Sequence, residues 1–109
     1  MTVSEFASRL SLNAFALPNG EREIEGGYVG DLLSWVMGRA QSGDVWITIM
    51  SNVNIVAVAS LADVACIVLA EGVVLDETVR ATAEQKGINV LGTERTAYQI
   101  ATELAGLLK

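Results

Sequence analysis

The amino-acid sequence predicts an α/β fold, a mainly parallel β-sheet flanked by helices. The first observation is an unbroken apolar run from Ala65 to Ala70, closed by Glu71 and Gly72. Short apolar runs of this kind are typical of central strands that are covered on both faces. The second observation is that strand and helix patterns alternate three times after Ser42. This alternation favours parallel strands joined by crossover helices.

The chain length sets the domain organisation that we expect. A chain of 109 residues is long enough for one hydrophobic core and too short for two. We therefore expect a single domain over 1–109, in which 1–29 form an N-terminal helix and edge strands and 30–109 form the core. With 51% hydrophobic and 18% charged residues, we expect part of the apolar surface to face a partner.

Charge and composition exclude several classes of function. The formal charge is −6 and the seven basic residues are scattered, so nucleic acid and anionic membranes are poor partners. No apolar run is long enough to cross a bilayer and the first residues do not resemble a signal peptide, which predicts a cytoplasmic protein. The sequence has no histidine and only one cysteine, Cys66, inside the apolar run. We therefore expect no metal site, no cofactor and no catalytic residue, and a buried, inert thiol.

The first third of the chain predicts one short helix and weak strands. Thr2 and Glu5 form a capping-box pattern, which predicts a helix that ends near Leu10. A strand over 13–17 is expected to turn back through a proline–asparagine–glycine turn. The following stretch, 21–25, alternates loosely and predicts at most a weak edge strand.

Three glycines within 26–31 precede a predicted helix over 32–40, with Asp31 as its N-cap. Glycines before a helix also occur in phosphate-binding loops, but the lysine and hydroxyl of such a loop are absent. A structural turn is therefore the favoured interpretation. We expect Trp35 and Trp46 to be packing residues, one of them partly exposed at an interface.

The remaining two thirds predict three strand–helix units. Gly87 is expected to end the second helix, and Thr96 and Gln99 form a second capping-box pattern. The predicted elements are a strand over 45–49, a helix over 53–61, the central strand 65–70, a helix over 76–86, a strand over 88–91 and a helix that starts between Thr93 and Thr96.

Parallel strands place their C-terminal ends at one edge of the sheet, where open α/β sheets bind ligands. We expect a small anion or nucleotide to bind there weakly, through backbone N–H groups near Asn52, Gly72 and Thr93, with help from Arg95. The alternative is that the polar residues, Ser51, Asn52, Thr93 and Thr96, only cap helices. The candidate ligand-binding residues are Ser51, Asn52, Glu71, Gly72, Thr93 and Arg95.

The predicted helix over 53–61 is apolar almost all round. One face would pack on the sheet, and a second copy of the chain is the simplest cover for the other. We therefore expect a homodimer with Val53, Val56 and Val58 at its interface. The alternative is that the segment 6–17 folds over this helix within one chain.

The stretch from about Gly30 to Ala101 resembles a DRTGG domain, an accessory α/β module of phosphotransacetylases and CBS-type pyrophosphatases with a fold like the N-terminal domain of HPr kinase. The matching features are Gly43–Asp44 before a strand, Asn54–Ile55 in the next helix, and 86–93. The resemblance implies a regulatory or dimer-forming domain that is not an enzyme.

Two positions depart from the family pattern. Ser51–Asn52 replace its Asp-Arg pair, and in 70–72 only Gly72 remains of its Thr-Gly-Gly.

Two classes of function remain. The first is a non-catalytic regulatory or interaction module that homodimerises and acts on a partner protein in trans. The second is a sensor of a nucleotide or phosphorylated metabolite, or a small enzyme, that uses the loop edge of the sheet. In the second class Glu71 or Glu94 would be the acid–base group, and Arg95 would hold an anion.

Overall fold

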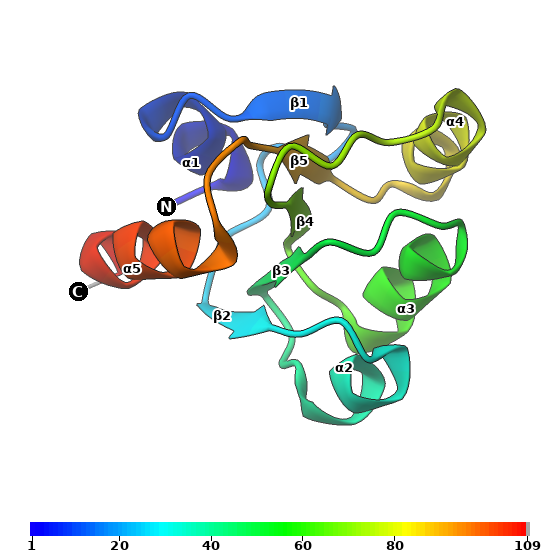
Figure 1. Cartoon of the computed structure of the whole chain (residues 1–109), viewed down its shortest axis with the longest axis horizontal. Helices are drawn as coiled ribbons and strands as arrows, with labels where there is room; N and C mark the ends of the chain where they lie inside the picture. Colours follow the sequence, from blue (N-terminus) through cyan, green and yellow to red (C-terminus); the bar gives the residue numbers. More distant parts are fainter. Residues whose placement is uncertain (109) are drawn as a thin grey trace.

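A computed structural model describes residues 1–108, in which one five-stranded sheet is packed between helices. The sheet order is β1-β5-β4-β3-β2, and only the β1–β5 pair is antiparallel (Figure 1). The predicted α/β class and the central position of β4 are therefore confirmed. The elements are α1 (Val3–Arg9), β1 (Asn13–Ala16), β2 (Gly26–Val29), α2 (Leu33–Arg39), β3 (Asp44–Thr48), α3 (Asn54–Ala62), β4 (Cys66–Leu69), α4 (Glu77–Lys86), β5 (Val90–Gly92) and α5 (Ala97–Leu107).

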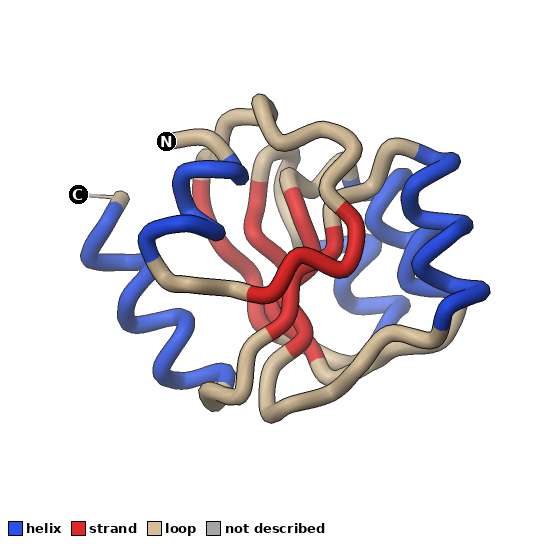
Figure 2. Tube along the Cα trace, turned by 90° about the horizontal axis from the view of Figure 1, so that it is seen from above, coloured by secondary structure: helices blue, strands red, loops and turns tan. Residues whose placement is uncertain are grey.

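The helices lie in two layers. From β2 to β5 each new strand is added on the same side of the last one, so right-handed crossovers place α2, α3 and α4 on one face. Helices α1 and α5 lie on the other face (Figure 2). Among the described residues, no helix is long and apolar enough to span a membrane.

Strand β4 is buried on both faces because successive side chains of a strand point to opposite sides. Cys66 and Val68 face the core formed with α1 and α5. Ile67 and Leu69 face the core formed with α2, α3 and α4. All four side chains have no exposed surface, which explains why this segment reads as a continuous apolar run.

Helix ends follow the sequence signals in three places. The predicted capping boxes of α1, at Thr2 and Glu5, and of α5, at Thr96 and Gln99, are both present. Helix α4 ends at Gly87, whose φ of 75° places it in the left-handed region that glycine adopts readily.

The glycine-rich segment before α2 is a strand and not a turn. Gly26 to Val29 form β2, an edge strand paired in parallel with β3. Asp31 is also not the N-cap of α2, since the cap is Leu32 without a side-chain hydrogen bond. Instead, the Asp31 carboxylate accepts hydrogen bonds from Thr48 Oγ1 at 2.7 Å and from the backbone N–H of Ile49 at 3.0 Å.

The predicted strand after the first helix exists, but its partner differs. Strand β1 pairs with β5, and 21–25 contribute only an isolated bridge between Glu23 and Thr2. The buried side chain of Asn89 holds the intervening turn. Its Nδ2 donates to the carbonyl oxygen of Asn19 at 2.8 Å, and its Oδ1 accepts from the Asn19 N–H at 2.9 Å. A contact this distant in sequence has no local signal.

Helix α3 lies between α2 and α4, which pack against its two sides (Figure 1), and Leu61 on it is 72% exposed. Val56 and Val58 are only 3% and 6% exposed, so the premise that their side chains lack cover is wrong. The alternative prediction, that the segment 6–17 folds over α3, is also wrong, because Phe6 belongs to the core on the opposite face of the sheet. Val53 alone of the three candidate interface residues is exposed.

Candidate functional site

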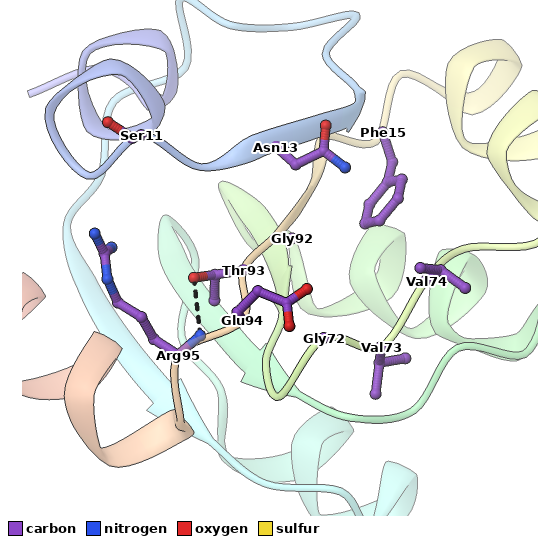
Figure 3. Close-up of a pocket in the computed structure, with 10 residues that line it drawn as sticks. All are labelled: Ser11, Asn13, Phe15, Gly72, Val73, Val74, Gly92, Thr93, Glu94 and Arg95. Atoms are coloured by element: carbon purple, nitrogen blue, oxygen red, sulfur yellow. Dashed lines mark hydrogen bonds between the residues drawn. The ribbon is translucent and has the colours of Figure 1, made fainter.

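A pocket of about 320 Å³ lies at the C-terminal edge of the parallel strands. We call it the loop-edge pocket (Figure 3). Its walls come from the start of β1, from the loop after β4, and from the end of β5 with the loop that follows. The lining residues are Ser11, Asn13 and Phe15; Gly72, Val73 and Val74; and Gly92, Thr93, Glu94 and Arg95.

The structure brings only part of the predicted site together. Gly72, Thr93 and Arg95 line the loop-edge pocket, whereas Glu71 and the loop with Ser51 and Asn52 do not. Ser11, Asn13 and Phe15 were missed because β1 was not expected beside β5. If that pairing had been predicted, the polar residues at the start of β1 would have indicated that this strand contributes to the pocket.

Of the backbone N–H groups predicted to bind an anion, those of Gly72 and Thr93 are already used. Glu71 and Gly72 are both left-handed, with φ of 63° and 75°. This turn lets the Gly72 N–H donate to the carbonyl oxygen of Thr93 at 2.9 Å, while the Thr93 N–H donates to that of Leu69 at 3.0 Å. The Glu71 N–H likewise donates to the carbonyl oxygen of Arg95 at 2.8 Å. The expected set of free donors at Gly72 and Thr93 is therefore absent from these loops.

The Arg95 guanidinium is also engaged outside the pocket centre. Its Nη1 donates to the carbonyl oxygen of Leu10 at 2.8 Å and lies 3.3 Å from Glu103 Oε2. The Glu94 carboxylate points the other way, toward Gly72 (Figure 3). A Cβ placed on Gly72 would lie 2.9 Å from Glu94 Oε1, so the absence of a side chain there makes room for this carboxylate. The two charged side chains that line the pocket, Glu94 and Arg95, therefore point to different sides of it (Figure 3).

The alternative that these polar loop residues cap helices is confirmed for Thr96 alone, since the N-cap of α3 is Val53 and Asn52 and Thr93 bond to the backbone without being N-caps. Asn52 Oδ1 accepts from the Asn54 N–H at 2.9 Å at the start of α3. Thr96 caps α5, and Thr93 Oγ1 accepts from the Arg95 N–H at 3.2 Å. Within residues 1–108, no three His, Cys, Asp or Glu side chains gather closely enough to hold a metal ion.

Comparisons with known proteins agree with the fold. The family model described as the DRTGG domain matches residues 29–107. A solved structure of the CBS and DRTGG domains, from the regulatory region of a Clostridium perfringens pyrophosphatase, is similar with a TM-score of 0.73 and 14% sequence identity. That region was crystallised with its activator, diadenosine tetraphosphate. The alignment covers 93% of this chain and 44% of that chain, so this chain spans less than half of the pyrophosphatase region. No curated protein matches.

Proposed function

The chain belongs to the DRTGG domain family, and from this premise we propose that it is a non-catalytic regulatory module that pairs with a second copy of itself. The pair would act on a partner protein in trans. Support comes from the related fold in the regulatory region of a pyrophosphatase. The observation that carries the proposal is an exposed apolar surface on α2.

The exposed apolar side chains of α2 and its flanking residues, which we call the α2 face, are Leu32, Trp35, Met37 and Ile49. These side chains are 57%, 51%, 49% and 48% exposed. Leu32 and Trp35 lie on one side of the helix, and Met37, two positions after Trp35, lies on the other. Ile49 lies beside the start of α2 because its N–H donates to the Asp31 carboxylate. Val36 alone is fully buried in α2, so most of this helix faces outward. Exposed apolar surface of this kind marks interaction sites in soluble proteins.

The charge on the α2 face also suits contact with an identical copy. Arg39 is the only charged residue of α2, and its guanidinium lies 3.7 Å from the centroid of the Trp35 ring. Like-charge repulsion between two copies is therefore small at this surface. A twofold contact is self-complementary, and a stable one buries roughly 800 Å² per subunit. The proposal moves the dimer contact from α3, where Val56 and Val58 are buried, to α2.

The alternative class, a sensor of nucleotides or phosphorylated metabolites or a small enzyme, has weaker support. Phosphate recognition needs free N–H donors or a free cation. At the loop edge, the Gly72 and Thr93 N–H groups and the Arg95 guanidinium already have partners within the chain. The Glu94 carboxylate would also repel a phosphate.

Sedimentation equilibrium of the intact chain tests the proposal. At micromolar concentration we expect twice the mass of one chain, and we expect Trp35→Asp to give the mass of one chain. Trp35 is half exposed, so this change should leave the fold intact. Circular dichroism checks that it does.

Two further variants serve as controls. Tyr98 is 80% exposed on α5, on the opposite face of the sheet, so Tyr98→Asp should leave the dimer unchanged. Leu61 is 72% exposed on α3, and Leu61→Asp tests the contact predicted from the sequence. A monomeric unmodified protein would refute the proposal. Dissociation by Leu61→Asp and not by Trp35→Asp would refute the assignment to α2.

A further inference from the structure

The loop-edge pocket has features of a ligand site that are independent of dimer formation. Its volume of about 320 Å³ is at the small end of the range for ligand pockets, which fits a molecule with one ring. One wall is apolar, formed by Phe15, Val73 and Val74. The other carries polar side chains, among them Asn13, Thr93 and Glu94.

Two glycines shape this pocket. A Cβ on Gly72 would lie 2.9 Å and 3.2 Å from the two carboxylate oxygens of Glu94. A Cβ on Gly92 would run into the Phe15 ring. The missing side chains therefore allow the Glu94 carboxylate and the Phe15 ring to lie close to the backbone on two sides of the pocket (Figure 3).

The Glu94 carboxylate is the charged acceptor that remains available in the pocket. Within residues 1–108, no hydrogen bond or ion pair reaches the Glu94 carboxylate or the Asn13 side chain in this structure. The Gly72 and Thr93 N–H groups bond to backbone carbonyls. Arg95 also lines the pocket, but its Nη1 bonds to the carbonyl oxygen of Leu10 and forms an ion pair with Glu103. The formal charge of −6 adds a background field that attracts cations and repels anions.

We propose that the loop-edge pocket binds a small planar organic cation of the amidinium or guanidinium class. Both oxygens of the Glu94 carboxylate accept hydrogen bonds from the two N–H groups of such a cation, in the paired geometry that planar cations form with carboxylates. The Phe15 ring provides an aromatic face for the flat body of the ligand, which a cation favours. The Asn13 side-chain amide lies on the β1 side of the pocket (Figure 3).

Three analogues of one shape test the proposal by isothermal titration with the full chain. Benzamidine is cationic, benzamide is neutral and benzoate is anionic, and all three carry the same ring. We expect saturable binding of benzamidine at millimolar concentration. Benzamide should bind on the order of tenfold more weakly, because it lacks the charge-assisted hydrogen bonds, and benzoate should not bind.

Matched variants locate the site. Glu94→Gln should weaken benzamidine binding on the order of tenfold. Glu71→Gln removes the same charge from an exposed side chain outside the pocket and should leave binding unchanged. Amide NMR spectra of the unmodified chain should show shifts at Gly72, Gly92 and Thr93.

Four results would overturn the proposal: no saturable binding of benzamidine, benzoate binding as tight as that of benzamidine, equal effects of Glu94→Gln and Glu71→Gln, or NMR shifts confined to other surfaces. The sedimentation experiment measures the mass of the protein and does not depend on ligand binding. The dimer proposal and the ligand proposal can therefore fail independently of each other.

Discussion

Cys66 shows how the interior of the sheet controls a reactive group. The side chain has no exposed surface in the core beneath α1 and α5, and burial raises the pKa of its thiol from 9.0 to about 12. A neutral, inaccessible thiol is a poor nucleophile. We expect Cys66 to react slowly with a water-soluble thiol reagent in the native state and quickly in denaturant. Native labelling at the rate of a free thiol would contradict this burial.

The same pKa shift predicts how stability depends on pH. Below pH 9.0 the thiol is protonated in both the folded and the unfolded chain, so it adds no pH dependence. Between pH 9.0 and about 12 only the unfolded chain loses this proton, which favours unfolding. Replacing Cys66 with Ala removes this contribution. The difference in unfolding free energy between the two proteins should therefore change above pH 9.0 and stay constant below it.

Glu71 holds local backbone strain. Its φ of 63° is unfavourable for a residue with a Cβ. Glu71→Gly should raise the free energy of unfolding by about 1 kcal/mol, because relief of strain exceeds the added chain entropy. Glu71→Ala removes the same charge but keeps the Cβ. Equal stabilisation by both variants in urea unfolding would show that charge, and not strain, is responsible.

At the scale of elements, the capping box of α5 fixes a helix that covers β2 and β3. Thr96→Ala removes the acceptor of the Gln99 N–H, a bond of 3.1 Å. We expect a loss of about 1 kcal/mol in thermal or urea unfolding. Thr102 lies in the middle of the same helix, where its hydroxyl donates to the carbonyl oxygen of Tyr98. Thr102→Ala should change stability much less, and an equal loss would show that the cap has no special role.

The elements that the sequence predicts well are those with local signals. The burial of β4, the end of α4 at Gly87 and both capping boxes depend on residues a few positions apart. Strand β2 was missed because glycine weakens strand propensity. Its glycines lie against side chains that are distant in sequence: a Cβ on Gly26 would lie 2.9 Å from Asp44 Oδ1, and one on Gly27 would lie 2.8 Å from Leu104 Cδ2.

The candidate site was also predicted only in part, because its geometry depends on contacts between residues that are distant in sequence. Parallel topology identifies the edge where the loops meet, and it correctly brings Gly72, Thr93 and Arg95 together. Topology does not tell whether a loop N–H is free. The left-handed turn at Glu71 and Gly72 pairs the two loops with each other, and only the folded structure shows this.

At the scale of the whole molecule, the apolar composition has two separate origins. Much of it forms the two cores on either side of the sheet. The rest is exposed, and the α2 face carries four of the ten exposed large apolar side chains of residues 1–108. We propose that this face joins two copies of the chain.

Acrylamide quenching of tryptophan fluorescence tests this claim most directly. Trp46 is fully buried and its Nε1 donates to the carbonyl oxygen of Gly30, so only Trp35, at 51% exposure, should respond to the quencher. We predict that quenching falls as protein concentration rises from nanomolar to high micromolar, because a second copy covers Trp35. Tyr98→Asp should show the same fall. Quenching that is independent of concentration, while the mass of the particle doubles, would show that the dimer forms elsewhere.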